Sequence, residues 1–272
     1  MLDRRGPLLT AWMYLMAGLL ALLAVGPALW LIAVAFQPAT ADLNSLGGGF
    51  TLDNFRSAWE DGNLAGPLLN SALITFVRAA LNVVLAALAA YPLARMNFRF
   101  RGTLFVLILA TMMIPEQVIV VPMFRIVVAM GLYDTLLAVI LPFSVTAFGI
   151  YLCRQAFLAI PPSLEEAARI DGANALQVWW HVMLPLAAPT LSTLALFSII
   201  SAWSELLWPL VVLQNESNFT LPVAINRLLG VFATNVRTAY AASVLSLVPI
   251  IVFFLVMHRW LKPSLFAGAV KG

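Results

Sequence analysis

Charged residues are scarce in this sequence. Only 10% of its 272 residues are Asp, Glu, Lys or Arg, whereas roughly 25% is usual in soluble domains. Hydrophobic residues make up 62% of the chain, and the mean hydropathy is +0.97. This composition excludes an ordinary soluble domain and predicts one domain, residues 1–272, embedded in a bilayer.

Cysteine, histidine and nucleotide-binding motifs are also rare or absent. Cys153 is the one cysteine, so no internal disulfide can form, and His181 and His258 lack metal-ligand spacing. No Gly-x-x-x-x-Gly-Lys-Ser/Thr sequence occurs. We expect no catalytic residue, no metal site and no cofactor in this chain. The net charge of +3 indicates membrane orientation rather than binding of nucleic acid.

Long apolar runs predict an all-α membrane protein with six transmembrane helices. About 20 apolar residues cross the hydrocarbon core as a helix. The predicted spans are Trp12–Phe36, Leu69–Leu93, Thr103–Val121, Thr135–Leu158, Leu186–Leu213 and Thr238–Trp260. The first span follows Arg4 and Arg5 but is longer than a signal-peptide core, so we expect it to be retained.

Lys and Arg are unequally divided between the two sets of connections. Ten lie on the side of the two termini and four on the other side. Because positive residues favour the cytoplasm, both termini, the Arg95–Gly102 loop and residues 159–185 are predicted to be cytoplasmic. The connections predicted to lie outside are residues 37–68, 122–134 and 214–237.

A polar segment, residues 160–185, separates the fourth and fifth predicted spans. Ser163 and Glu166 have the spacing of a helix-capping box, and Gly172 is placed as a C-cap. A second helix is predicted from Ala173 to the residue before Pro185, which would interrupt it. Two interpretations of this helix-turn-helix remain, an interfacial tether between spans or a surface on which a partner closes.

The same segment carries a recognisable signature. Glu166-Ala167-Ala168, three residues, Gly172, nine residues and Val182-Met183-Leu184-Pro185 resemble the EAA motif of ABC importer permeases. Residues 50–55, 112–115, 201–210 and 267–272 resemble the carbohydrate-uptake branch of that family, the maltose and glycerol-phosphate type. The last stretch resembles the second of two non-identical permeases. Ser204-Glu205 departs from the branch, which more often has Asn before the acidic residue.

The resemblance implies a permease that is not itself an enzyme and that moves a sugar or sugar-like solute inward by alternating access. The implied partners are a second homologous permease, an ATPase dimer that binds ATP and Mg, an extracytoplasmic substrate-binding protein and the lipid of a bacterial inner membrane. The implied docking residues are Glu166, Ala167, Ala168, Asp171 and Gly172, with Glu166 reaching a basic group. Val270 and Lys271, in the cytoplasmic tail 263–272, are implied to contact the ATPase.

Polar side chains within the predicted spans are candidates for a translocation path. Ser198, Ser201, Glu205 and Trp208 are three or four residues apart, so we expect them on one helical face. That face either lines the path or packs against the sister permease. Trp203 and Trp208 are candidates for stacking on sugar rings, or they belong to an interfacial belt.

Two more ionisable residues lie in apolar runs. Glu116 follows the helix-disturbing Pro115 and either gates the path or lies at the outer interface. Arg78, near Asn82, is either buried and paired or extends towards headgroups. A competing function is a secondary transporter or channel that uses intramembrane carboxylates. Such a protein needs no cytoplasmic docking segment, and the inverted repeats of many secondary transporters are not recognisable here.

Overall fold

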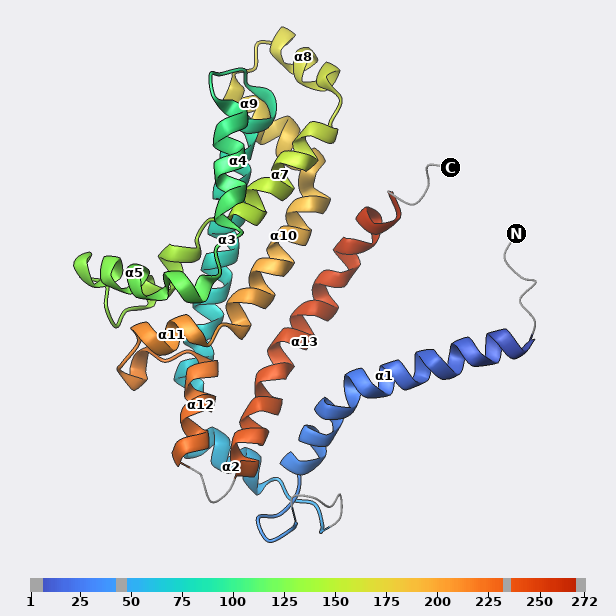
Figure 1. Ribbon diagram of the computed structural model, residues 1–272, viewed down its shortest axis with the longest axis vertical. Helices are drawn as coiled ribbons and strands as arrows, with labels where there is room; N and C mark the ends of the chain where they lie inside the picture. Colours follow the sequence, from blue (N-terminus) through green and yellow to red (C-terminus); the bar gives the residue numbers. More distant parts are fainter. Residues whose placement is uncertain (1–6, 43–47, 232–235, 268–272) are drawn as a thin grey trace. The chain divides into compact units, whose positions relative to one another are not determined.

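The computed structural model describes residues 7–42, 48–231 and 236–267 (Figure 1). Every regular element within these ranges is helical. The elements are α1 (Pro7–Ala35), α2 (Asp53–Glu60), α3 (Ala65–Arg95), α4 (Arg101–Thr111), α5 (Glu116–Ala129), α6 (Leu136–Ile140), η1 (Leu141–Phe143), α7 (Ala147–Ala159), α8 (Pro162–Ile170), α9 (Ala175–Val178), the π-helical turn η2 (Trp179–Met183), α10 (Leu184–Ser204), α11 (Leu207–Val212), η3 (Glu216–Asn218), α12 (Leu221–Val231) and α13 (Val236–Ala267).

Four helical segments in the described ranges are long and apolar enough to cross a membrane. They are Leu9–Ala35, Ala65–Arg95, Ala175–Ser204 and Val236–Val256. Two bent pairs, α4 with α5 and α6–η1 with α7, bring the number to six if each pair is one span. An all-α membrane protein is confirmed, and the predicted six spans are the upper limit of this range.

The third predicted span, Thr103–Val121, is wrong as a single straight helix. α4 ends at Thr111 and α5 begins at Glu116, with a bend of 100° between them. Pro115 lies at the break with φ −59° and ψ 133°. Its ring and missing N–H prevent the helix from continuing through it, so the chain turns sharply there.

The fourth and fifth predicted spans are also interrupted. Thr135–Leu158 bends by 43° before α7, whose N-cap Thr146 is extended and accepts a hydrogen bond from the Gly149 N–H. Leu186–Leu213 is two helices, because Glu205 has ψ 118° and ends α10. Pro185 does not interrupt the chain as predicted. α9, η2 and α10 form one continuous helical segment, Ala175–Ser204, and Pro185 lies two residues after the π-helical turn η2.

The described chain forms two compact units. In the first, Met1–Leu64 with Ile225–Val248, Asn54 ties α2 to the end of α1. Its Nδ2 donates to the carbonyls of Ala35 at 2.9 Å and Gln37 at 2.7 Å. Phe36 packs on Phe55 with ring centroids 4.6 Å apart. These contacts satisfy the carbonyls that the end of a helix leaves without partners.

α3 is the central helix of the second unit, Ala65–Ala224 with Pro249–Gly272, and packs against α7 and α10. Its small buried side chains face Phe157 and Met183 in one apolar core; they are Ala86, Ala87, Ala90 and Ala94. Gly149 of α7 lies so close that a Cβ there would be 3.0 Å from the Asn82 side chain. Small residues permit this approach, which is typical of packed membrane helices.

Asn82 joins three helices in the interior of this unit. Its Nδ2 donates to Ser198 Oγ of α10 at 2.8 Å, and its Oδ1 accepts from the Thr146 N–H before α7 at 2.9 Å. Hydrogen bonds between polar side chains stabilise helix contacts in an apolar environment. The bonds of Asn82 therefore help to set the positions of α3, α7 and α10 around the cavity described below.

Asp134 connects two loops of the second unit, outside the candidate spans. Its carboxylate accepts from the N–H groups of Gln214 at 2.8 Å and Asn215 at 3.1 Å. Its carbonyl accepts from Asn218 Nδ2 at 2.6 Å. The Gln214 N–H is the main cause of a lowered pKa of the Asp134 carboxyl.

We expect this aspartate to make stability depend on pH. Because its folded pKa lies below its unfolded pKa of about 3.9, its contribution is present above that pH and is lost as pH falls through the folded pKa. The melting temperature, followed by tryptophan fluorescence, should fall less steeply between about pH 6 and about pH 3 in Asp134→Asn than in the parent. Identical slopes in the two proteins would contradict this expectation.

Candidate functional site

Two helices joined by a turn form the segment between α7 and α10. α8 and α9 lie at the end of α3 from which the chain continues to α4 (Figure 1). Pro161 is the N-cap of α8 and no side chain caps it, so the predicted Ser163–Glu166 capping box is wrong. Pro162, with its preset φ, begins the helix instead. A capping box does occur one helix later, at Asn174 and Gln177.

Gly172 takes the predicted C-cap position after α8. Its φ is +88°, a left-handed conformation that favours glycine. The Gly172 N–H donates to the Arg169 carbonyl at 3.1 Å, and the Ala173 N–H donates to the Ala168 carbonyl at 2.9 Å. This is the hydrogen-bond pattern of a Schellman motif, which sets the angle between the two helices.

The predicted docking residues lie on two parts of this segment. Ala168, Asp171 and Gly172 line a groove of about 380 Å³ between α8 and the start of the next helix, together with His181 and others. Glu166 and Ala167 are exposed on α8 itself. Ile170, which is 86% exposed, is not among the residues predicted from the sequence. An apolar side chain in a polar helix was a usable signal of an interaction surface.

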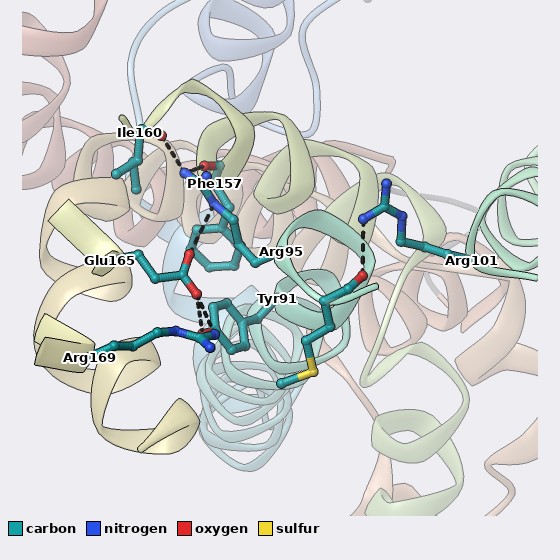
Figure 2. Close-up of polar contacts among 8 residues, drawn as sticks. Tyr91, Arg95, Arg101, Phe157, Ile160, Glu165 and Arg169 are labelled. Atoms are coloured by element: carbon teal, nitrogen blue, oxygen red, sulfur yellow. Dashed lines mark hydrogen bonds and ion pairs between the residues drawn. The ribbon is translucent and has the colours of Figure 1, made fainter. Parts of the chain in front are cut away.

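Glu165 anchors α8 to the end of α3 (Figure 2). It is buried, and its Oε1 accepts from the Tyr91 hydroxyl at 3.1 Å and from Arg169 Nη2 at 2.8 Å. Its Oε2 is 3.6 Å from Arg95 Nε, and both side chains of this ion pair are about nine-tenths buried. The hydrogen bond from Arg169 to Glu165 is the main cause of a raised pKa of Arg169, so this cation stays charged.

Two arginines link the ends of α3 and α7 behind Glu165. Arg95 of α3 donates to the carbonyls of Phe157 and Ile160 at the end of α7, as Figure 2 shows. Arg154 of α7 donates to the Leu93 carbonyl of α3 at 3.0 Å. Each arginine thus satisfies terminal carbonyls of the other helix and complements the negative end of its dipole.

Glu165 is not among the site residues predicted from the sequence. Its separation of four residues from Arg169 was a usable local signal of an ion pair. The contacts to Tyr91 and Arg95 join residues more than 60 positions apart in the chain, since Tyr91 is 74 residues from Glu165. No local pattern identifies such a pair. α8 is therefore fixed to the rest of its unit by a glutamate adjacent to the EAA motif.

A cavity of about 580 Å³ lies within the second unit. Its wall includes Ser198 and Ser201 of α10 and Glu116 at the start of α5, all predicted path residues. Arg78 of α3 also lines it. The aromatic side chains in the wall are Phe143, Phe148 and Phe197. Hydroxyl, charged and aromatic groups facing one hollow are suited to binding a small polar solute.

The structure does not bring the remaining path candidates to this cavity. Trp208 is buried in a second apolar core, where its Nε1 donates to the Ala138 carbonyl at 2.9 Å. Glu205 is the C-cap of α10 and accepts from the Trp208 N–H at 3.2 Å. Because the helix ends at Ser204, the predicted common face does not extend to Glu205 and Trp208. Trp203 is half-buried and is not in the cavity wall described.

Two predicted contacts fall beyond the described residues. Val270 and Lys271 of the C-terminal tail lie outside the ranges that the structure describes. Of the predicted tail, residues 263–272, the first five lie in α13, which ends at Ala267.

Comparisons with known proteins agree with this arrangement. Residues 82–267 match the family model "Binding-protein-dependent transport system inner membrane component". The arabinooligosaccharides transport system permease protein AraQ of Halalkalibacterium halodurans is 33% identical, with 100% of both chains covered. The trehalose transport system permease protein SugB of Mycobacterium tuberculosis is 35% identical, over 92% of this chain and 93% of its own.

A solved structure shares the fold over most of its length. A chain of a bacterial ABC transporter involved in the import of the acidic polysaccharide alginate superposes with a TM-score of 0.83 at 26% identity, over 95% of this chain and 98% of that one. The chain therefore belongs to the binding-protein-dependent transport system inner membrane components, the multi-pass inner-membrane permease subunits of ABC importers.

Proposed function

We propose that this permease imports a carbohydrate or a carbohydrate-like solute by alternating access. The similar permeases named above are described as belonging to transport systems for arabinooligosaccharides and for trehalose. The cavity within the second unit supports the proposal, since its Ser201 hydroxyl and its phenylalanine rings offer the two kinds of contact that sugars use. The alternative of a carboxylate-based secondary transporter is not favoured, because the family and the similar permeases are parts of binding-protein-dependent ABC importers.

A separate ATPase dimer supplies the energy in this proposal, binding ATP and Mg. The chain carries no phosphate-binding loop and is not itself an enzyme. A second homologous permease completes the path, and an extracytoplasmic substrate-binding protein delivers the solute. Both termini and residues 160–185 lie in the cytoplasm, and the C-terminal Val270 and Lys271 contact the ATPase.

The observation that carries the proposal is the exposed surface of α8, a helix that Glu165 anchors to α3. Glu166, Ala167 and Ile170 are exposed, whereas the adjacent Glu165 is buried in an ion pair with Arg95. A mere tether needs neither this anchor nor an 86% exposed isoleucine beside a groove. We assign ATPase docking to Glu166, Ala167, Ala168, Asp171 and Gly172, with Ile170 as an apolar contact.

Glu166→Ala tests this assignment. Glu166 is exposed and forms no hydrogen bond or ion pair among the described residues, so the change should leave the isolated chain as stable as the parent. If Glu166 meets a basic group of the ATPase at a partly desolvated interface, docking should lose on the order of 2–5 kcal/mol. The measurements are co-purification with the ATPase and ATP hydrolysis stimulated by the loaded binding protein.

The control is Glu60→Ala, which removes an exposed glutamate from α2. Its ion pair with Arg56 is highly exposed and contributes little to stability. This variant should co-purify with the ATPase like the parent. Parental docking in Glu166→Ala would remove this residue from the interface, and failure of the parent itself to bind an ATPase would remove the proposed function.

A further inference from the structure

Arg78 is a buried cation in the interior of a candidate transmembrane helix. It lies well inside α3, Ala65–Arg95, and only 5% of its surface is exposed. Its Nη1 is buried and has no hydrogen-bond partner within the described ranges. Its guanidinium carbon is 4.6 Å from the centroid of the Phe143 ring, a cation–π contact that offsets only part of the cost of burial.

Glu205 and Glu116 interact electrostatically with this cation, but neither is close enough to form an ion pair with it. No ion pair of Arg78 occurs in the part of the chain that the structure describes. Charged residues at membrane depth are costly and normally face a partner or a cavity. Arg78 does line the 580 Å³ cavity, so an anion placed there would lie beside this cation.

Other polar groups of the cavity wall are largely engaged with one another. Asn82 donates to Ser198 Oγ and accepts from Thr146, and Thr111 Oγ1 donates to the Ile108 carbonyl at 2.7 Å. Arg78 and the exposed Ser201 and Glu116 are the lining groups that remain to contact a solute. Glu116 is exposed in the chain taken by itself, whereas Arg78 is buried.

We propose that Arg78 binds an anionic group of the transported solute, a carboxylate, sulfonate or phosphate carried by a sugar-like body. A guanidinium pairs with such groups through two parallel N–H bonds. Phe148 and Phe197, in edge-to-face contact with centroids 5.9 Å apart, line the same cavity and suit the apolar face of a sugar ring. The inference rests on the proposed import function and names the class of solute.

The charge of the cavity can be measured with a thiol at Ser201. In the assembled transporter with cysteine-free partner subunits, Ser201→Cys is treated with an anionic sulfonatoethyl and a cationic trimethylammonioethyl methanethiosulfonate. Cys153 is fully buried, so the chain without the new thiol gives the background. Arg78→Gln should lower the anion-to-cation rate ratio about tenfold, and Arg78→Lys should keep it near the parent value. Because all variants keep Glu116, a difference in this rate ratio between them reports the charge at residue 78.

A second measurement uses two matched sugars. D-glucuronate should slow the reaction of Ser201→Cys with a neutral maleimide, whereas D-glucose at the same concentration should not, and Arg78→Gln should abolish the difference. A rate ratio that Arg78→Gln leaves unchanged, as expected if a carboxylate of the second permease neutralises Arg78, would overturn the proposal. Equal protection by the two sugars would overturn it too. Binding of the ATPase, scored on the same preparations, tests the import function separately.

Discussion

Replacing Glu165 with alanine should lower the melting temperature of the chain by roughly 5–10 °C. The reason is the buried Arg95, which would lose its only carboxylate partner within the described ranges. Removing one member of a buried ion pair typically costs about 3–5 kcal/mol, because the other charge stays buried and uncompensated. Tyr91 would also lose the acceptor of its hydroxyl hydrogen bond. The effect should greatly exceed that of Glu166→Ala on the same chain.

Cys153 provides a built-in reporter for this experiment. The thiol is fully buried in the same apolar core as Tyr91 and Phe157, so a maleimide dye reacts with it only as that core opens. Ser163→Ala is the matched control, since Ser163 is exposed on α8 and no side chain caps that helix. Glu165→Gln should fall between the two, because an amide keeps a hydrogen-bond acceptor for Tyr91 but no charge for Arg95. Melting of Glu165→Ala at the parental temperature would show that this ion pair does not hold α8 in place.

The sequence predicts those features of the fold that depend on residues close together in the chain, and it does not predict those that depend on tertiary packing. Apolar runs identify α1, α3 and α13 because hydropathy over about 20 residues is a property of the segment alone. The 100° bend at Pro115 was predicted only as a disturbance. A proline shows that the helix must change, but packing against the rest of the chain sets the angle.

The candidate site also contains features that local sequence predicts and features that depend on distant residues. Gly172 was identifiable as a C-cap, because a left-handed turn depends on local backbone sterics. The capping pair at Ser163 and Glu166 was wrong because Pro162, one residue earlier, already begins the helix. The cavity joins Arg78 to side chains of α5 and α10 that are far away in sequence. Residue spacing along a single helix does not indicate which side chains of different helices line the same cavity.

Gly172→Val should uncouple the transporter while leaving the chain folded. At φ +88° a residue with a Cβ is strained by roughly 1–2 kcal/mol, and a β-branched residue by more. A Cβ at this position would meet no atom within 4 Å, so the strain lies in the backbone and not in a clash. The turn can relieve it only by abandoning the Schellman hydrogen bonds of Gly172 and Ala173, which would rotate α8 relative to the next helix.

The groove between these helices should therefore change shape while Glu165 still holds α8 to α3. We expect the complex with the ATPase to form in reduced yield, ATP hydrolysis stimulated by the binding protein to fall several-fold and the melting temperature reported by Cys153 to change by a few degrees. Gly172→Ala should show the same changes at smaller size, because alanine tolerates a left-handed backbone better than valine does. The control is Gly102→Val in α4, where a Cβ also meets no atom within 4 Å but φ is not positive. If both valine variants couple like the parent, the angle set at Gly172 has no part in transmitting ATPase closure, and α8 is a tether.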